Sequence, residues 1–406
     1  MITLPKVAVI KLPPKPFDDE VFEAVKKCLD ALGGAKAFAS PGDKVLVKPN
    51  ICAFNFSMTT DRRVYYSLAV IFRDLGCEVT IGENPVINTP SKELFASHEM
   101  KKVAEKAGVK VVNFREHEFI KVKVPNPITF REIEVSEFVV NSDVIINVPT
   151  MRKHALAGLT LSLKNLYGFV SLEQRHAMHS YSLYWGLVEI AKTFKDKIKL
   201  TVMDGIYASL DGLMVPIGLI MASSDMVALD ALTSYILGWD PTKLETIRYA
   251  SQVGVGAGNL NEIEVEGVDL DELKKIRETV AKHFNPSWPD PREVAKRLGK
   301  VEIVYGDPCP TCERNVATIL SGYSPKDFEK APDLAIVLGP GAKPVEGKVN
   351  IIVGDCLKKY AGEGIFVPCC PAYLHDLKCA IDYAIGKTSE RIYLWEKLLP
   401  LIKQWV

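Results

Sequence analysis

The chain has 406 residues, of which 48% are hydrophobic and 25% are charged, with 50 Lys and Arg against 50 Asp and Glu. This length and composition indicate a globular protein of about two or three domains and exclude disordered, collagen-like and disulfide-scaffold chains. Balanced charge argues against a nucleic-acid-binding surface, which needs an excess of Lys and Arg. No apolar run approaches the about 20 residues that span a bilayer, and the first residues do not resemble a secretory signal. We therefore expect a cytoplasmic protein without a membrane or nucleic-acid partner.

Short apolar runs rich in β-branched residues alternate with amphipathic segments of helical length along most of the chain. Strands are predicted at 7–11, 45–50, 78–83, 109–114, 144–148, 200–204 and 219–222. Helices are predicted at 18–33, 62–75, 91–107, 157–168, 181–194 and 226–237. This alternation is typical of an α/β fold with a mostly parallel sheet that helices cover on both faces. The stretch from about 119 to 139 alternates without a helical segment, which predicts an antiparallel excursion from the body.

A proline-rich segment at 284–292 predicts a linker, and the α/β pattern starts again after it. Strands are predicted at 301–305, 334–338, 349–353 and 365–367, with helices from about 311 and from about 373. The sequence therefore predicts an α/β body over residues 1–295 and a smaller C-terminal α/β domain over residues 296–406.

Polar side chains follow four of the strands predicted in the body. They are Lys48 and Asn50, then Glu83, then Lys153 and His154, and finally Asp204. In an open parallel sheet, ligands bind beyond the carboxyl ends of the strands. A solvated loop is the alternative for any one of these positions, since loops are polar in general. Their coincidence at four strand ends favours a ligand-binding cleft.

Two further segments add polar residues to this predicted cleft. Lys164 and Asn165 interrupt an apolar stretch, so a buried Lys164 would need a partner or an anionic ligand; the alternative is a lysine that reaches solvent from a helix edge. Arg175, His176 and His179 follow closely, and the two histidines share one face of a helix. A metal there would lack a visible third ligand, so we expect Arg175 and a histidine to capture an anion.

Three common functional motifs are absent from the sequence. There is no phosphate-binding P-loop and no dinucleotide-binding glycine fingerprint after a strand. There is also no nucleophile elbow, which excludes a typical α/β-hydrolase.

Six of the nine cysteines lie in the last hundred residues. Cys309 and Cys312 form a C-x-x-C pair after one predicted strand, Cys356 follows a second strand, and Cys369 and Cys370 follow a third. If these strands are parallel, the three groups gather at one edge of the sheet, where helix N-termini stabilise thiolates. A pair, a single cysteine and a cysteine before proline suit a [4Fe–4S] cluster.

Other interpretations of these cysteines remain open. Structural zinc sites usually use two close pairs, and only one C-x-x-C is present. A thiol–disulfide site at Cys309 and Cys312 would leave Cys356 and Cys369 unexplained. We expect Cys309, Cys312, Cys356 and Cys369 to be the metal ligands, with Cys370 as the alternative to Cys369.

Several segments resemble the domain-of-unknown-function 362 family. The similarity covers about residues 37–240 and rests on the Lys48-Pro-Asn50 segment, on Thr59-Thr60, on the strand that ends at Glu83, and on two longer segments, Asp143–His154 and Leu159–Gly168. The family is often described as iron–sulfur-associated, without one agreed activity. Some members carry a ferredoxin insert that this chain lacks. The resemblance adds Thr60 to the candidate substrate-binding residues. The Cys369-Cys370-Pro371 segment is similar to cluster-binding segments of hydrogenase small subunits.

The sequence thus predicts a redox enzyme with a [4Fe–4S] cluster next to a cationic cleft that binds an anionic small molecule. Lys48, Asn50, Thr60, Glu83, Lys153, Asn165, Arg175 and Asp204 would bind the substrate, and His154, His176 and Lys164 would be catalytic. An electron-transfer protein and a second copy of the chain are further candidate partners. The alternatives are a non-redox transferase, isomerase or lyase with structural zinc, or a binding or electron-carrier module.

Overall fold

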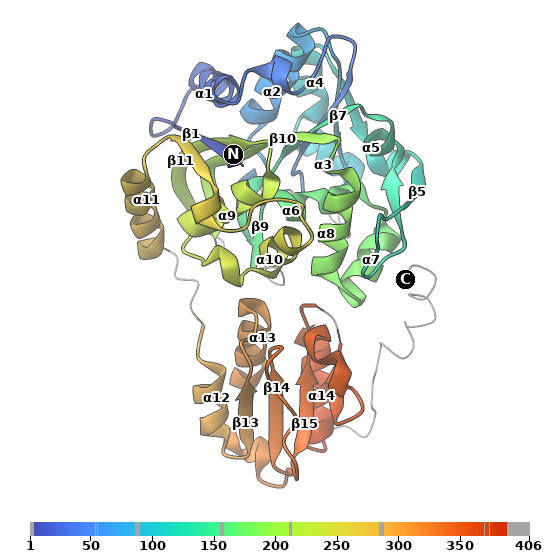
Figure 1. Cartoon of the computed structure of the whole chain (residues 1–406), viewed down its shortest axis with the longest axis vertical. Helices are drawn as coiled ribbons and strands as arrows, with labels where there is room; N and C mark the ends of the chain where they lie inside the picture. Colours follow the sequence, from blue (N-terminus) through green and yellow to red (C-terminus); the bar gives the residue numbers. More distant parts are fainter. Residues whose placement is uncertain are drawn as a thin grey trace.

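The computed structural model describes residues 4–387 except 53, 55, 86–89, 155–157, 211–212, 284–287, 369 and 373. Two main sheets of different size organise these residues (Figure 1), and a third sheet has only two strands. We call the part built on the larger sheet the body and the part built on the smaller sheet the C-terminal unit.

The body contains a ten-stranded sheet whose main order is β12-β1-β11-β10-β7-β2-β3-β4, with β8 and β9 joined through β10. Within this main path β11 is antiparallel to both neighbours and the remaining pairs are parallel. The mostly parallel sheet predicted from the sequence is therefore confirmed. The strands are β1 (Lys6–Lys11), β2 (Lys44–Pro49), β3 (Glu78–Glu83), β4 (Lys110–Asn113), β7 (Val144–Val148), β8 (Thr150–His154), β9 (Gly158–Thr160), β10 (Ile198–Leu210), β11 (Leu213–Ser223) and β12 (Glu264–Gly267).

Helices cover both faces of this sheet because its strands are apolar on both sides. In β10, for example, Val202 packs into the core on one face and Met203 into the core on the other. One face carries α1 (Asp18–Ala31), α2 (Arg62–Asp74), α3 (Ser91–Ser97) and α4 (Met100–Ala107). The other carries α5 (Glu137–Asn141), α6 (Ser162–Asn165), α7 (Leu172–Ser180), α8 (Leu183–Phe194), α9 (Met226–Ile236), α10 (Glu245–Gln252) and α11 (Leu270–His283).

The antiparallel excursion predicted at about 119–139 is confirmed. Strands β5 (Phe119–Lys123) and β6 (Glu132–Ser136) form a separate two-stranded antiparallel sheet. Their buried residues Ile133 and Val135 join the core on the α8 side of the body. The hairpin thereby leads the chain from β4, at one edge of the sheet, back to β7 near its centre.

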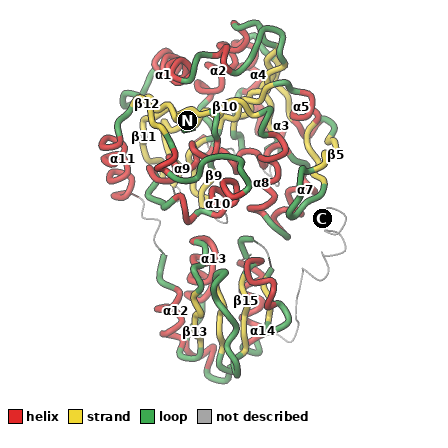
Figure 2. The backbone as a smooth tube through the Cα atoms, viewed as in Figure 1, coloured by secondary structure: helices red, strands yellow, loops and turns green. Residues whose placement is uncertain are grey.

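The C-terminal unit is a four-stranded parallel sheet with the strand order β13-β14-β15-β16. Figure 2 shows its strands flanked by helices. Its elements are β13 (Val301–Tyr305), β14 (Leu334–Leu338), β15 (Val349–Val353), β16 (Ile365–Val367), α12 (Pro291–Leu298), α13 (Pro310–Ser321) and α14 (Leu374–Ala384). Val294 and Leu298 of α12 pack into the core of this unit. The boundary predicted between 295 and 296 would cut α12, so we propose a boundary before Pro291.

Two predicted helices differ from the structure. The helix at 157–168 is replaced by β9, the short α6 and a 3₁₀ turn at Leu166–Phe169. Residues 158–169 are all buried, so the apolar residues among them carry no one-sided helical pattern. The helix at 91–107 is divided into α3 and α4, because Glu99 adopts the left-handed conformation with φ of 52°.

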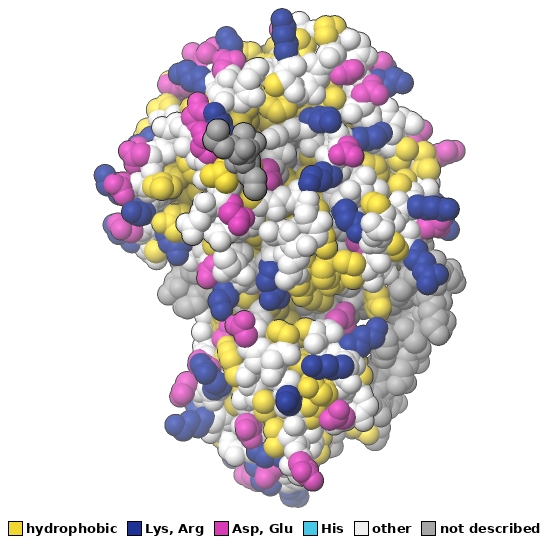
Figure 3. All heavy atoms as spheres, in the orientation of Figure 1, with side chains coloured by type: hydrophobic (Ala, Val, Ile, Leu, Met, Phe, Trp, Pro, Cys, Tyr) yellow, Lys and Arg dark blue, Asp and Glu magenta, His cyan; other side chains and the backbone are white. Residues whose placement is uncertain are grey.

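Positive and negative side chains are interspersed on the face of the molecule drawn in Figure 3, as the balanced composition leads one to expect. Within the described residues, no helix is both long and apolar enough to cross a membrane.

Candidate functional site

The candidate site lies at the carboxyl ends of β2 and β7. Strand β2 pairs with β3 on one side and with β7 on its other side. The helix that follows β2 and the helix that follows β7 cover opposite faces of the sheet. Such a reversal of strand order opens a crevice where open α/β sheets bind ligands. Lys48 of β2 and Asn147 of β7 are register partners at this point.

Lys48 is fully buried, and its ammonium group donates to three oxygen atoms at the carboxyl ends of the strands. Its Nζ donates to Glu83 Oε2 at 2.9 Å, to Asn165 Oδ1 at 3.0 Å and to its neighbour Pro49 O at 3.0 Å. The Asn165 amide in turn donates to Asn147 Oδ1 at 2.7 Å. Burial lowers the pKa of Lys48, and Glu83 opposes this effect. The structure therefore brings together three of the predicted residues, from β2, β3 and α6.

Gly168 permits this close packing. A Cβ atom at Gly168 would lie 2.4 Å from Glu83 Oε1 and 2.4 Å from Lys48 Cε. Any side chain at this position would therefore displace the buried ion pair.

Lys164 lies beside this group and is 8% exposed. Its Nζ lies 3.8 Å from the centroid of the Tyr167 ring. Burial, together with the nearby charges of Arg152 and Arg175, lowers the pKa of Lys164 to about 7. We call Lys48, Arg152, Lys164 and Arg175 the cationic cluster.

Arg175 of α7 is 1% exposed and binds the loop that follows β3. Its guanidinium donates to Pro85 O at 2.6 Å and to Asn84 O at 2.7 Å. The half-buried Arg115 donates to the same loop, at Asn84 Oδ1 and Pro85 O. Burial lowers the pKa of Arg175 to about 10. Arg175 therefore lies in the predicted cleft and also fixes the loop after Glu83.

Three histidines near the site, of which His154 and His176 were predicted to be catalytic, are placed differently from one another. His176 is exposed on α7. His179, one turn further on, contacts the Tyr167 hydroxyl and lies 3.1 Å from Arg175 O through Nδ1. Burial and the nearby Lys164 lower the pKa of His179 to about 3. The backbone of His154 ends β8 and its side chain lies outside the described residues, while Lys153 is half-buried on the same strand.

Cys52 and Arg152 were not among the predicted site residues, yet they complete the group. The Arg152 guanidinium donates to Cys52 Sγ, and Cys52 Sγ donates to Met58 O at 3.0 Å. Electrostatic interactions with Cys52 raise the pKa values of both Lys48 and Lys164, although burial dominates both shifts. In the sequence, Cys52 follows Lys48 closely and Arg152 directly precedes Lys153. These two positions could have indicated that both residues belong to the site.

Asn50 and Thr60 form a layer next to the cationic cluster. The Asn50 backbone N–H donates to Thr60 Oγ1 at 2.8 Å, and Thr60 Oγ1 donates to Val148 O at 2.7 Å. The Asn50 side chain donates to Met58 O at 2.8 Å. These bonds tie the loop after β2 to the end of β7.

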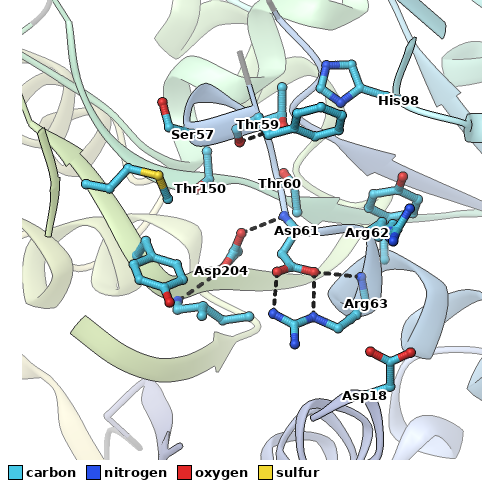
Figure 4. Close-up of a pocket in the computed structure, with 15 residues that line it drawn as sticks. Asp18, Ser57, Thr59, Thr60, Asp61, Arg62, Arg63, His98, Thr150 and Asp204 are labelled. Atoms are coloured by element: carbon cyan, nitrogen blue, oxygen red, sulfur yellow. Dashed lines mark hydrogen bonds and ion pairs between the residues drawn. The ribbon is translucent and has the colours of Figure 1, made fainter. Parts of the chain in front are cut away.

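Asp204 faces a separate cavity of about 490 Å³ that Thr60 also lines (Figure 4). The Asp204 carboxylate accepts hydrogen bonds from the N–H groups of Asp61 and Ile206. Burial raises its pKa, and the neighbouring Asp61 adds to this effect. Asp61 pairs with Arg63 at the start of α2. Of the predicted residues, Asp204 and Thr60 thus line this cavity, whose lining does not include Lys48 or Lys164.

The cysteines of the C-terminal unit follow its strands as predicted. Cys309 begins α13, and its Sγ accepts from the Cys312 N–H at 3.2 Å. Cys356 follows β15 in a short 3₁₀ helix. Burial and the nearby Cys309 raise the pKa of Cys370, whereas Cys356 is exposed. Cys369 lies outside the described residues.

This cysteine group faces α8 and α10 of the body. Tyr184 donates through its backbone N–H to Cys370 O at 3.2 Å and through its hydroxyl to Thr311 Oγ1 at 2.8 Å. The Tyr249 hydroxyl lies 3.7 Å from Cys370 Sγ. The body and the C-terminal unit therefore meet at the cysteines.

Glu245 of α10 bears on which ligand the cysteine group can bind. Its carboxylate is 3% exposed and interacts with Cys309, and burial raises its pKa to about 7. Within the described chain, its Oε2 has no hydrogen-bond partner. A buried carboxylate oxygen without a donor, next to several thiols, fits a cationic occupant. Among the described residues, no group of three or more His, Cys, Asp or Glu side chains is placed to hold a metal ion.

Comparison with known proteins bears on the body. Residues 45–234 match the model of a family described as "Domain of unknown function (DUF362)". This range contains β2, β3, β7 and α6, and with them the cationic cluster. Residues 45–234 are therefore similar to the DUF362 family. The resemblance found in the sequence is thus confirmed.

The proteins similar to the chain include a curated relative and a solved structure. A thylakoid-associated protein of Synechocystis sp. is 26% identical over 246 residues, which are 57% of this chain and 74% of that protein. A lactate racemase apoprotein from Thermoanaerobacterium thermosaccharolyticum has 13% identity and a TM-score of 0.38. The match covers 58% of this chain and 57% of the racemase.

Proposed function

We propose that the chain is an enzyme that binds an anionic small molecule at the cationic cluster of its DUF362-like region. We further propose that it carries a [4Fe–4S] cluster at Cys309, Cys312, Cys356 and either Cys369 or Cys370, and that the reaction is a redox reaction. A redox reaction would require an electron-transfer protein as a partner. Homodimer formation and a cytoplasmic location also remain proposals.

The observation that carries the anion-binding proposal is the excess of buried positive charge. Glu83 and Asn165 satisfy Lys48, whereas backbone carbonyl groups accept from two of the Arg175 nitrogen atoms and its buried Nε has no hydrogen-bond partner within the described chain. Within the described residues, the Lys164 ammonium has neither a hydrogen bond nor a carboxylate partner. Buried charge without a partner is costly. An anion at the carboxyl ends of β2 and β7 would supply the missing negative charge.

The cluster proposal is supported by the donor set at the junction of the two parts. The thiol groups come from the start of α13, from the segment after β15 and from the segment after β16. The Cys370 side chain is buried and interacts electrostatically with Cys309. When bound, a [4Fe–4S] cluster would supply one-electron chemistry.

The α7–α8 segment connects the two proposed sites. His179, on the last turn of α7, contacts Tyr167 in the cationic cluster region. Tyr181 lies two residues further along the chain, and its ring faces Lys358, two residues after Cys356. Tyr184 then binds the cysteine group. A change at the cysteines would therefore reach the anion site through one short segment.

Metal analysis tests the cluster proposal. The full chain would be purified without oxygen, and its iron, acid-labile sulfide and zinc contents would be measured together with its EPR spectrum after reduction. About four iron and four sulfide per chain would support the proposal. A colourless protein with stoichiometric zinc would contradict it.

Anion binding is tested separately by isothermal titration calorimetry with oxalate and with inorganic phosphate. We expect binding by the wild-type protein that Arg152→Met and Lys164→Met each weaken by tenfold or more. Lys101→Met, which removes an exposed lysine of α4, is the matched control. Equal affinities in all four proteins would contradict the proposal.

A non-redox enzyme with structural zinc is the second candidate function. It is favoured by Glu245, because a carboxylate next to thiolates is a ligand type that zinc accepts. In this case the protein contains zinc without sulfide. The reaction would then take place entirely at the cationic cluster.

A further inference from the structure

Lys164 has the features of a reactive amine. It belongs to the short helix α6, and its ammonium group lies against the face of the Tyr167 ring. Within the described part of the chain, it has no hydrogen-bond or ion-pair partner. The backbone around it is fixed, because Asp230 of α9 accepts from the N–H groups of Ser162 and Leu163 at 2.7 Å and 3.0 Å. The amine therefore packs against an aromatic ring but forms no hydrogen bond or ion pair with a described side chain.

The charges around Lys164 come from several packed elements. Positive charge comes from Lys48 on β2, Arg152 on β8 and Arg175 on α7. The other titratable groups that face this region are Cys52 after β2, Glu83 on β3, Tyr167 and His179. Glu83 is bonded to Lys48, so the charges next to Lys164 are mainly positive. This environment and burial both favour the neutral amine over the ammonium.

A neutral buried lysine beside other cations is the arrangement in which an amine attacks a carbonyl group. The surrounding guanidinium and ammonium groups would hold the carboxylate or phosphate group of the same substrate. Lys48 is a less suitable nucleophile, because its three hydrogen bonds occupy its donors.

We propose that Lys164 forms an imine with an anionic aldehyde or ketone held by the cationic cluster. The Lys164 nitrogen forms a bond to the carbonyl carbon, and the carbonyl oxygen takes up a proton to give a carbinolamine. The C–O bond then breaks, and the oxygen leaves as water with the two protons that the amine has lost. The step is a condensation and needs neither an oxidant nor a reductant. It rests on the anion-binding part of the proposed function and is independent of the metal.

Reductive trapping tests this inference on the full-length protein. The protein is incubated with glyoxylate and sodium cyanoborohydride, which reduces the imine to a stable secondary amine, and adducts are located by peptide mass mapping. Acetaldehyde, which has the same reactive group without a charge, is the control reagent. We expect one main adduct, at Lys164, that forms at least tenfold faster with glyoxylate and is suppressed by oxalate. It should be absent in Lys164→Arg and retained in Lys101→Arg.

The outcomes separate this inference from the proposal on which it rests. If oxalate binds but glyoxylate gives no adduct at Lys164, the imine is overturned and the anion site stands. If exposed lysines react as readily as Lys164, the imine is also overturned. If neither oxalate nor glyoxylate binds, both proposals fail. The mapping uses the wild-type protein, so the result does not depend on the folding of a variant.

Discussion

Lys48 Nζ and Glu83 Oε2 lie 2.9 Å apart at the carboxyl ends of two neighbouring strands, where their side chains are 1% and 4% exposed. A buried ion pair needs further hydrogen bonds to offset its lost hydration. Here Asn165 and Pro49 satisfy the lysine, while the N–H groups of Ile51 and Asn84 satisfy the carboxylate. The pair therefore fixes the positions of the side chains at the carboxyl ends of β2 and β3.

Removing the charge of Glu83 should destabilise the protein strongly. Glu83→Gln leaves Lys48 without its carboxylate, and we expect the free energy of unfolding to fall by about 3–5 kcal/mol. Urea unfolding measures this change. The exposed Glu99, which pairs with Lys102, provides the control, because Glu99→Gln should leave the free energy of unfolding nearly unchanged. An equal loss in both variants would contradict this account of the buried pair.

Gly168→Ala should disturb the same pair by steric conflict. The added Cβ would overlap Glu83 Oε1 and Lys48 Cε, so we expect a loss of about 1–3 kcal/mol in unfolding free energy. Weaker oxalate binding should accompany it. Gly362→Ala is the matched control, since nothing lies within 4 Å of the place that an added Cβ would take there. An unchanged free energy of unfolding in Gly168→Ala would contradict the close packing of Glu83 and Lys48 against this glycine.

Lys164 should make stability depend on pH. Because its folded pKa of about 7 is below its ordinary value of 10.5, the unfolded chain binds more protons between these pH values. The free energy of unfolding should therefore rise with pH from about 7 to about 10.5, and this contribution should disappear in Lys164→Met. Denaturant unfolding at several pH values would measure the difference between the two proteins. A constant difference across this range would show that Lys164 titrates normally.

Cys356→Ser should reduce the bound metal without unfolding the body. Cys356 lies beside Cys309 in the proposed ligand set, so we expect iron and sulfide per chain to fall by at least half. Cys379→Ser is the control, because Cys379 lies on α14 and contacts His375 instead. Iron content that falls equally in both variants would indicate general destabilisation rather than loss of a ligand.

Much of the fold could be predicted from local sequence. The strands at 78–83, 144–148 and 301–305 have the predicted bounds, because short β-branched runs bordered by polar residues allow few alternatives. The stretch around Lys164 was predicted wrongly as one helix. Its residues are buried on all sides, so hydrophobic periodicity contained no information there.

Several residues of the candidate site could be predicted one by one, but the sequence did not show which of them lie together. Lys48, Glu83 and Asn165 were recognised as polar residues after apolar segments, and the structure joins them. Asp204 carried the same signal and Thr60 was added by the family resemblance, but both line a separate cavity. Strand order causes this difference, because Asp204 lies on β10 beyond β7, away from the β2–β3 side.

The sequence by itself determined the α/β class, the antiparallel excursion and the DUF362 resemblance, because each follows from local patterns of side chains. Only the tertiary structure decided which cations share one buried site, that Cys52 and Arg152 belong to it, and that the cysteine group faces Glu245 and Tyr249 of the body. These relationships join residues that are 30 to more than 100 positions apart along the chain. Pairing and packing of whole elements set such distances, and no local pattern encodes them.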